Sequence, residues 1–289
     1  SNGDMFIEKY LQNPKHLEFQ IMGDKHGNVI HLGERECSLQ RKHQKIVEEA
    51  PSASVTPEMR AEMGEMAVRF AKSIGYYSAG TIEFIMDEDG TYYFMEMNTR
   101  IQVEHPVTEI ITGTDLVELQ IRVARGEVLA LKQEDLKIKG HAVELRVYAE
   151  DPLNDFLPSV GHLDVYQLPV GEGVRVDNGF EQGMDIPIYY DPMLSKLITY
   201  GATREEAIQR SRRALAEFEI QGLATALPFH RAIVEDSNYT EVFKVYTSYI
   251  ENEFVNEIPA YTSESLDIQT LDLNLPQHRH LPGRKQNYP

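Results

Sequence analysis

The spacing of apolar and polar residues predicts two β-hairpins in the first third of the chain. Residues 17–21 and 29–32 alternate on either side of a polar turn, and a polar, basic stretch follows them. A second pair of strand-like runs, TIEFIM and TYYFMEMN, is joined by a segment that contains Asp89-Gly90. Asp-Gly favours a two-residue type I′ turn, so we expect these two residues to form the tip of the second hairpin.

Apolar residues at helical spacing predict three amphipathic helices. Thr56 and Pro57 are typical of an N-cap and a first helical turn, and Thr203 with Glu206 forms a capping box. The methionines of the first helix are interpreted as core packing, because a flexible thioether side chain fills irregular gaps. The helices are expected at residues 57–74, 115–126 and 203–218.

Strand patterns dominate the second half of the chain and predict an α+β fold in two parts. Runs such as HAVELRVY and KLITY are separated by turns rich in proline and glycine. A polar connector precedes them, and a polar tail that contains prolines follows them. The predicted division is a first part at residues 1–126, a connector at 127–139, a second part at 140–252 and a tail at 253–289.

The composition is that of a globular protein with an acidic excess. Apolar residues make up 42% and charged residues 26% of the 289 residues, and 28 basic against 46 acidic residues give a net charge of −18. This charge argues against a general attraction to nucleic acid or anionic membranes. The sequence has no apolar run of about 18 residues, its start is not a signal peptide, and it has a single cysteine, Cys37. We expect a cytoplasmic protein.

The second hairpin brings acidic residues together. With Asp89-Gly90 at its tip, Glu83 lies opposite Glu96, and alternation places Asn98 on the same face. Like charges directly opposite each other destabilise a hairpin unless a cation lies between them. Carboxylate and amide oxygens suit Mg²⁺ or Mn²⁺, so these residues are a candidate metal site. A solvated acidic face that keeps the strand edge soluble is the alternative.

A cluster of basic residues in this acidic chain is a candidate site for an anionic substrate. Its members are Arg35, Arg41, Lys42, His43 and Lys45. The segment NTRIQVEHPVTE follows the acidic hairpin and gathers several polar side chains at a strand end, where functional sites tend to lie. Pro106 is expected to keep this segment non-helical.

Several motifs resemble biotin carboxylases. The C-terminal half of the ATP-grasp domain of that family is similar to EKYLQNPKHLEFQ, ERECSLQRKHQKIVEEAPS, TIEF and EMNTRIQVEHPVTE. The domain that follows it in the family is similar to HAVELRVYAEDP, FLPSVG and YYDPMLSKLITYG. The resemblance implies the second half of an ATP-grasp domain followed by a biotin carboxylase C-terminal domain, an antiparallel sheet with packed helices. In the family, ATP phosphorylates bicarbonate to carboxyphosphate, and the carboxyl group is transferred to N1 of biotin.

The resemblance also implies roles for individual residues. Glu104 is the general base that deprotonates bicarbonate, and Arg100 holds bicarbonate and stabilises the enolate of biotin. Arg146 contacts biotin, with a plain ion pair to Glu144 as the alternative. The implied ATP-binding residues are Glu8, Lys9, Tyr10, Leu11, His16, Gln40, His43, Glu83 and Glu96. The implied metal ligands are Glu83, Glu96 and Asn98, and the implied bicarbonate site is Lys45, Arg100, Gln102 and the backbone of Val103.

The same resemblance implies substrates and partners. The small molecules are ATP, Mg²⁺ or Mn²⁺, bicarbonate, and biotin on a carrier. The partners are a biotin carboxyl carrier protein or domain, a carboxyltransferase and further copies of the full-length chain. RVYAED and IYYDPMLSKLITYG are closer to acyl-CoA carboxylases, which act on acetyl- or propionyl-CoA in fatty acid metabolism, than to pyruvate carboxylase. The acceptor itself is chosen by the carboxyltransferase.

Two features depart from the family pattern. The N-terminal domain and the lid with its Gly-rich phosphate loop have no counterpart in these residues, and the tail matches nothing in the family. We therefore expect a fragment that lacks bicarbonate-dependent ATPase and biotin carboxylation activity when it is alone. Two alternatives stay open: another ATP-grasp ligase, such as a carbamoyl-phosphate synthetase half, and a non-catalytic module for oligomer contacts.

Overall fold

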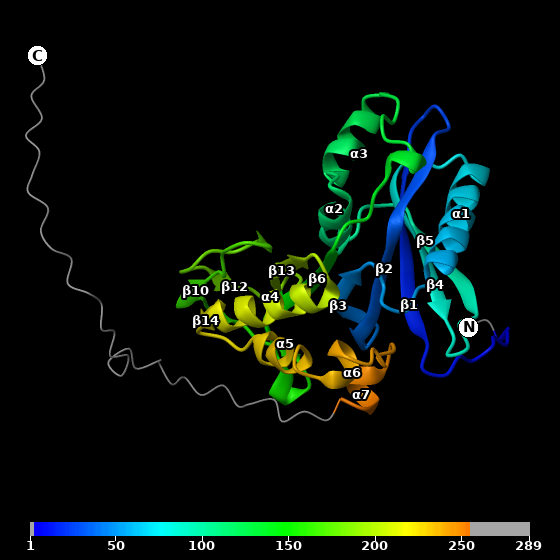
Figure 1. Ribbon diagram of the computed structural model, residues 1–289. Coiled ribbons are helices and arrows are strands. Elements are labelled where there is room, and N and C mark those ends of the chain that lie inside the picture. The colour runs from blue at the N-terminus through cyan, green and yellow to red at the C-terminus, as the bar shows by residue number, and fades with distance from the viewer. Residues whose placement is uncertain (1–2, 255–289) are drawn as a thin grey trace, which may run out of the picture. The chain divides into compact units, whose positions relative to one another are not determined.

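The computed structural model describes residues 3–254, which are organised around one antiparallel sheet (Figure 1). The eight strands follow the order β11-β13-β6-β3-β2-β1-β4-β5. Their bounds are β1 Lys15–Gly23, β2 Val29–Arg41, β3 Gln44–Ala50, β4 Ser78–Met86, β5 Tyr92–Asn98, β6 His141–Tyr148, β11 Val174–Asn178 and β13 Met193–Gly201. Both predicted hairpins are present, and the α+β fold is confirmed. From residue 255 on, the predicted tail lies outside the described residues.

Short elements surround this sheet. Three two-stranded ladders pair β7 Glu150–Asp151 with β8 Leu157–Pro158, β9 Gly161–His162 with β12 Asp185–Ile186, and β10 Val165–Gln167 with β14 Glu219–Gln221. The short helices are η1 Gln133–Asp135, η2 Pro152–Asn154, α5 Leu227–Ile233, α6 Ser237–Thr240 and α7 Tyr249–Asn252. Within residues 3–254, no helix has the length and apolar character that crossing a bilayer requires.

The three predicted helices are confirmed apart from their end residues. They are α1 Pro57–Ser73, α3 Leu116–Ala124 and α4 Arg204–Glu217. The side chain of Thr56 accepts a hydrogen bond from the first turn of α1, and that of Thr203 does the same for α4. Met63 of α1 is fully buried against the sheet, in agreement with a packing role for the methionines.

A fourth helix, α2, corrects the expectation for Pro106. The helix runs over His105–Thr112, and Pro106 occupies its first turn. Backbone N–H groups in the first turn have no partner inside the helix, so a proline there removes no hydrogen bond. α2 ends at Gly113, whose φ of 67° is left-handed. Val107 and Ile111 pack its apolar side onto the sheet.

The tip of the β4–β5 hairpin differs from the predicted two-residue turn. Asp87 N–H donates to the Thr91 carbonyl at 2.8 Å, which leaves three residues in the loop. The last of them, Gly90, has a φ of 84°, a value that glycine adopts without strain. The pairing next to the tip is therefore displaced by one residue from the predicted register.

A β-bulge further along the same hairpin reverses this displacement. Phe84 pairs with Phe94, whereas Glu83 pairs with Glu96, so Met95 is an extra residue on β5. Met95 is 45% exposed. Because the bulge restores the register, Glu83 lies opposite Glu96 as predicted, even though the predicted turn is wrong.

Helices cover both faces of the sheet (Figure 1). α1 and α4 cover one face, where they pack against residues such as Phe19 and Leu145. α2 and α3 cover the other. Because successive side chains of a strand point to opposite faces, Glu18 and Arg146 face α2.

The sheet is continuous across the two predicted parts of the chain. β3 precedes the predicted connector and β6 follows it, and these two strands pair with each other.

Candidate active site

A row of charged side chains crosses the sheet on the face that α2 covers, and we call it the charged row. Residues paired across adjacent antiparallel strands share a face and have Cβ atoms about 5 Å apart. The pairs are Glu96–Glu83, Glu83–Glu18, Glu18–Arg35, Glu48–Glu144, Arg146–Lys196 and Lys196–Asp177. Most of these side chains are buried, so their charges need partners within the protein.

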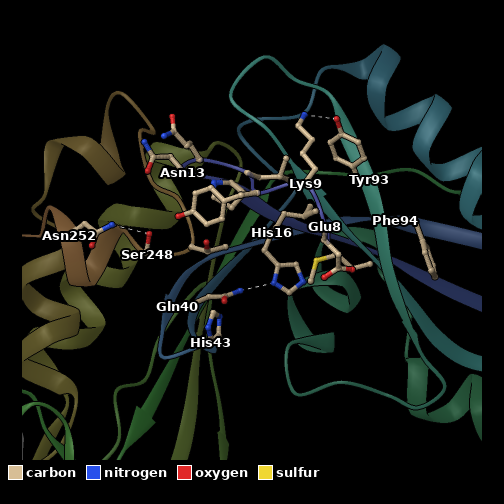
Figure 2. Close-up of a pocket in the computed structure, with 17 residues that line it drawn as sticks. Glu8, Lys9, Asn13, His16, Gln40, His43, Tyr93, Phe94, Ser248 and Asn252 are labelled. Atoms are coloured by element: carbon tan, nitrogen blue, oxygen red, sulfur yellow. Dashed lines mark hydrogen bonds between the residues drawn. The ribbon is translucent and has the colours of Figure 1, made fainter. Parts of the chain in front are cut away.

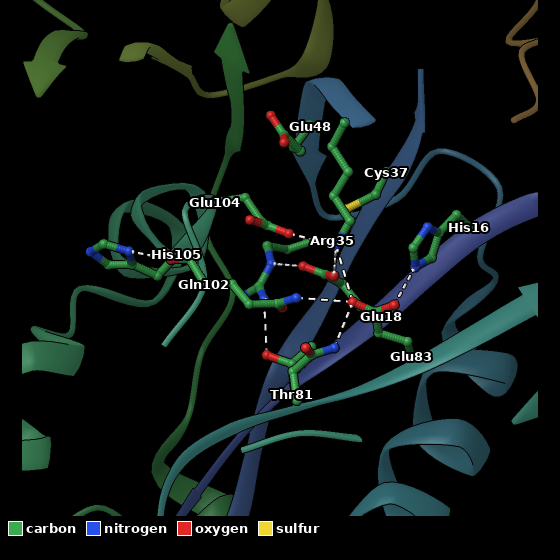
Figure 3. Close-up of polar contacts among 12 residues, drawn as sticks. His16, Glu18, Arg35, Cys37, Glu48, Thr81, Glu83, Gln102, Glu104 and His105 are labelled. Carbon is green, nitrogen blue, oxygen red and sulfur yellow. Dashed lines mark hydrogen bonds and ion pairs between the residues drawn. The ribbon is translucent and has the colours of Figure 1, made fainter. Parts of the chain in front are cut away.

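Donors surround the Glu83 carboxylate (Figure 3). The surrounding atoms are His16 Nε2 at 3.0 Å, Asn98 Nδ2 at 3.0 Å, Gln102 Nε2 at 2.9 Å and Lys45 Nζ at 3.2 Å. Burial alone would raise the pKa of Glu83, but the hydrogen bond from His16, the charge of Lys45 and the hydrogen bond from Gln102 lower it to about 2. Glu83 is therefore ionised at neutral pH.

Two cations hold the Glu104 carboxylate at the N-cap position of α2. Lys45 Nζ lies 2.6 Å from one oxygen, and Arg146 Nη2 donates to the other at 3.0 Å. Lys45 also lies 2.5 Å from Glu18, so it links Glu104 to the rest of the charged row. Burial would lower the pKa of Lys45, but the negative charges around it raise that pKa. The result is a buried carboxylate, 2% exposed, between two permanent positive charges.

Arg35 is a structural residue, which corrects its expected place in an anion-binding cluster. Its side chain is fully buried. It donates hydrogen bonds to Glu18, Gln20, Thr81, Gln102 and Thr108. Arg41 and Lys42 are paired with Asp155 instead of pointing into the site. Two other members of the predicted basic cluster lie at the site: Lys45 contacts Glu18 and Glu83 of the charged row, and His43 lines the cavity described below.

The predicted metal ligands meet at the β4–β5 end of the charged row. Asn98 Nδ2 donates to both Glu83 and Glu96, at 3.0 and 3.2 Å. The amide therefore lies between the two acids, where a bridging cation would lie. Two carboxylates and an amide that turns its oxygen inward form the hard oxygen donor set that Mg²⁺ or Mn²⁺ prefers. The residues fit a divalent cation.

The segment from Arg100 to Glu104 lies between the predicted metal ligands and the two cations Lys45 and Arg146. Arg100 is exposed and donates from Nη2 to Asn98 Oδ1 at 3.2 Å. The Val103 carbonyl accepts a hydrogen bond from Lys196 Nζ at 2.7 Å. These contacts fix the segment over the charged row and leave the Arg100 side chain at its solvent side.

A cavity of about 940 Å³ lies beside the charged row (Figure 2). Its walls include the predicted nucleotide residues other than Glu83 and Glu96, namely Glu8, Lys9, Tyr10, Leu11, His16, Gln40 and His43. His16 joins the cavity to the charged row, because its Nδ1 accepts from Gln40 Nε2 at 2.6 Å while its Nε2 donates to Glu83. The volume is that of a typical small-molecule or cofactor site.

The structure adds residues that the sequence reasoning did not single out. Tyr93, Phe94, Ser248 and Asn252 complete the cavity. Glu18, Glu48 and Lys196 complete the charged row. Glu18 had a readable signal, because HLEFQI alternates polar and apolar residues and so places Glu18 on a separate face from Leu17 and Phe19. The others depend on contacts between distant segments.

Arg146 forms ion pairs with glutamates other than Glu144, the partner that the sequence suggested. Its Nε donates to Glu48 at 2.5 Å and its Nη2 to Glu104, and neither contact involves Glu144. Glu144 lies next to it on the same face of β6. Arg146 therefore links the candidate base to β3.

Acid is expected to destabilise the fold through Glu18 and Glu83. Burial would raise both pKa values, but the adjacent cations and hydrogen bonds lower each from 4.5 to about 2. A lowered pKa contributes stability that is present above pH 4.5 and is lost as the pH falls towards 2. Denaturant titrations across this range should show the loss. Glu83→Gln should flatten the profile, and an unchanged acid dependence in that variant would contradict the assignment.

Two family models match the chain. The ATP binding domain of the carbamoyl-phosphate synthase L chain matches residues 1–132, and the biotin carboxylase C-terminal domain matches residues 144–252. The first matched region contains Glu83 and Glu104, and the second contains Arg146.

Known proteins agree with both models. The chain is 56% identical over 235 residues to a pyruvate carboxylase subunit from Methanothermobacter thermautotrophicus, covering 81% of this chain and 48% of that protein. It is 54% identical over 239 residues to the mitochondrial propionyl-CoA carboxylase alpha chain of Mus musculus, covering 82% of this chain and 33% of that protein.

A solved structure gives the same result. The biotin carboxylase domain dimer of Hydrogenobacter thermophilus 2-oxoglutarate carboxylase, in complex with magnesium ADP, ADP and bicarbonate, superposes with a TM-score of 0.83 and 52% identity, over 84% of this chain and 54% of that one. The chain thus spans about half the length of this structure and of the pyruvate carboxylase relative, and a third of the propionyl-CoA carboxylase chain. By both its folded regions and its relatives, the chain belongs to the biotin carboxylase family.

Proposed function

We propose that the protein, at its native length, is an ATP-dependent ligase that uses bicarbonate to carboxylate biotin. The observation that carries this proposal is the position of Glu104, a buried carboxylate held by Lys45 and Arg146 beside a nucleotide-sized cavity. A carboxylate between two cations can receive a proton from a small anion that those cations attract. Bicarbonate is such an anion, and in the proposed reaction Glu104 removes the bicarbonate proton.

The proposed roles follow the order of residues along the site. ATP occupies the cavity, with its phosphates towards His16 and Glu83. Glu83, Glu96 and Asn98 hold Mg²⁺ or Mn²⁺, which neutralises phosphate charge when it is bound. Bicarbonate is bound by Lys45, Arg100, Gln102 and the backbone of Val103. Glu104 removes its proton, and Arg100 then stabilises the biotin enolate because a planar cation matches a delocalised oxyanion. Arg146 contacts biotin from the far end of the charged row.

The proposal includes partners. Biotin is presented by a carrier protein or domain, and a carboxyltransferase passes the carboxyl group to the final acceptor. The relatives named above are components of pyruvate, propionyl-CoA and 2-oxoglutarate carboxylases, so the acceptor varies while the matched region stays similar. The acceptor proposed for this protein is acetyl- or propionyl-CoA, which would place it in fatty acid metabolism. Homo-oligomer formation and a cytoplasmic location remain predictions of the sequence.

A second ATP-grasp reaction has one observation in its favour. The model that matches residues 1–132 is named for the ATP binding domain of the carbamoyl-phosphate synthase L chain. The two reactions differ in their second substrate. ATP cleavage that requires free biotin or a biotinylated carrier supports biotin carboxylase, whereas cleavage that requires an ammonia donor supports the synthase. A protein that binds no nucleotide with metal would instead be a non-catalytic interaction module.

The direct test measures ATP cleavage by the protein at its native length. We expect turnover that requires bicarbonate and Mg²⁺ and that rises with free biotin, and we expect radiolabelled bicarbonate to appear on biotin. Bicarbonate-independent hydrolysis, or label that never reaches biotin, would contradict the proposal.

Metal binding gives a separate prediction for Glu96. Glu96→Gln should weaken binding of Mn²⁺ with nucleotide, because it removes one of the two opposed carboxylates and leaves the fold of an exposed strand intact. Manganese binding in the presence of ADP can be followed by electron paramagnetic resonance. Glu127→Gln, an exposed acid away from the site, is the matched control and should bind as the parent does. Equal affinity in Glu96→Gln would remove Glu96 from the metal site.

A further inference from the structure

Two glutamates, Glu48 and Glu144, form a buried carboxyl pair beneath Arg146. They are direct partners on β3 and β6, so their side chains share the face that α2 covers. Both are fully buried. Nothing in the proposed reaction uses either carboxyl group, yet the pair lies one side chain away from Glu104.

Three of the four carboxyl oxygens in the pair have no hydrogen-bond partner among residues 3–254. Glu48 Oε1 accepts from Arg146 Nε at 2.5 Å, whereas Glu48 Oε2 and both oxygens of Glu144 accept nothing. Buried polar atoms are normally satisfied, so this deficit needs an explanation. The charged or titratable groups that face the pair are Lys45 of β3, Arg146 and Tyr148 of β6, Lys196 of β13 and Glu104 before α2.

The contacts of the surrounding cations decide the charge of the pair. Lys45 contacts Glu18, Glu83 and Glu104, and Lys196 contacts the Val103 carbonyl and Asp177. Neither contacts the pair. Arg146 alone does so, and it is shared with Glu104. Two buried carboxylates that face one cation cannot both be ionised without a large desolvation cost.

A single proton removes one of the two negative charges and can pair two of the three unpaired oxygens. A protonated Glu144 gains an O–H donor, and its cross-strand partner Glu48 offers an unpaired acceptor oxygen. Burial and the neighbouring acid raise the pKa of Glu144 well above its usual range, and burial raises the pKa of Glu48 to about 7. Glu144 is thus the member that keeps the proton, and Glu48 is the member that faces Arg146.

We propose that Glu48 and Glu144 share one proton, and that the single remaining charge, on Glu48, makes Glu48 a positioning residue that draws Arg146 away from full pairing with Glu104. The kinetic part of this inference rests on the proposed function, whereas the shared proton does not. With Glu48 in place, Arg146 is divided between two acids, and Glu104 keeps the basicity needed to accept a proton. Without it, Arg146 pairs with Glu104 alone and weakens that base.

The shared proton is tested without any measurement of activity. Infrared difference spectra at neutral to mildly alkaline pH should contain the carbonyl band of a protonated carboxylic acid, and Glu144→Gln should remove it. Glu127→Gln should leave the band unchanged. The raised pKa values of both acids give stability that is lost as the pH rises above 4.5, and for Glu48 the loss continues through about 7. The parent protein should therefore lose thermal stability over this range, and Glu144→Gln, which has only Glu48 left to titrate in the pair, should lose less. No band in the parent, or a band that survives Glu144→Gln, would overturn the shared proton.

The positioning role is tested by kinetics in the protein at its native length. Glutamine resembles protonated Glu144, so Glu144→Gln should keep kcat and the pH profile. Glu48→Gln should lower kcat, by analogy with metal sites, where loss of an orienting partner costs about 10- to 100-fold, and should move the acid limb of the profile to lower pH with little change in the KM for ATP. Glu48→Asp, which keeps the charge, should recover part of the rate.

The outcomes separate the two proposals. If the parent shows the carboxylic acid band but no biotin-dependent turnover, the proposed function fails and the shared proton stands. If turnover is present and Glu48→Gln folds, as judged by circular dichroism, but keeps the parent kcat and pH profile, the positioning role is overturned. Equal kinetic loss in Glu144→Gln and Glu48→Gln would also overturn it, because a neutral amide would then fail to replace a neutral acid.

Discussion

Glu104→Gln is expected to lower kcat for bicarbonate-dependent ATP cleavage by about 10²- to 10⁴-fold, the usual cost of losing a positioned base. Glutamine keeps the size of the side chain and can still accept a hydrogen bond from Lys45 or Arg146, but it cannot take the bicarbonate proton. The affinity for ATP should stay close to that of the parent, because the cavity is lined by other residues. Steady-state kinetics and nucleotide titration on the same preparation measure both quantities.

Two further variants make this result specific. Glu49→Gln is the matched control, since Glu49 is also buried, is paired with Arg204 and contacts His141, but it faces away from the charged row. It should cost stability and leave turnover unchanged. Arg100→Ala should impair both bicarbonate use and the biotin step, because it removes a charge that two successive anions need. A Glu104→Gln protein with normal turnover would refute the assignment of the base.

Arg35→Met is expected to cost about 3–5 kcal/mol in the free energy of unfolding, the range found when one partner of a buried ion pair is removed. Its guanidinium is completely buried, and it bonds to Glu18 and to side chains from β1, β4, the segment before α2, and α2 itself. Burial would lower the pKa of Arg35, but Glu18 and the other nearby negative charges raise it, so the residue is charged in the fold. Chemical denaturation gives the free energy.

The control for Arg35 is an ion pair in solvent. Arg122 pairs with Glu118 one turn away on α3, and both side chains are about half exposed. Arg122→Met should change stability little, because water screens such pairs and their side chains stay mobile. A similar, small effect for Arg35→Met would mean that Lys45 alone satisfies Glu18, and it would return Arg35 to the anion-binding cluster that the sequence suggests.

The sequence predicted the elements better than it predicted the contacts between them. Local signals located α1, α3 and α4, because caps and apolar spacing act within one segment. Glu83 lies opposite Glu96 as predicted, although the predicted turn was wrong. The three-residue turn shifts the register by one residue, and the bulge at Met95 shifts it back to that of a two-residue turn. No rule that reads one hairpin at a time distinguishes these two solutions.

The charged row was beyond local reasoning for a physical reason. Arg35 was interpreted as a substrate-binding cation because its acidic partner, Glu18, lies on another strand. Glu48 was not recognised as a site residue because strand β3 was not predicted. Both assignments require the strand order, which depends on pairing between distant segments. The resemblance to biotin carboxylases supplied the site residues, and their functional roles stay predictions.

The expectation for Pro106 was wrong for a different reason. The effect of a proline on a helix depends on whether it occupies the first turn, and Pro106 does.

The β3–β6 pairing has a mechanical consequence. Glu104 belongs to the first matched region and Arg146 to the second, and the β3–β6 ladder joins strands of these two regions. A hinge between the two matched regions would have to stretch or break this ladder. The sheet therefore holds the two matched regions together, and any opening that admits substrates has to come from segments that pack around the sheet.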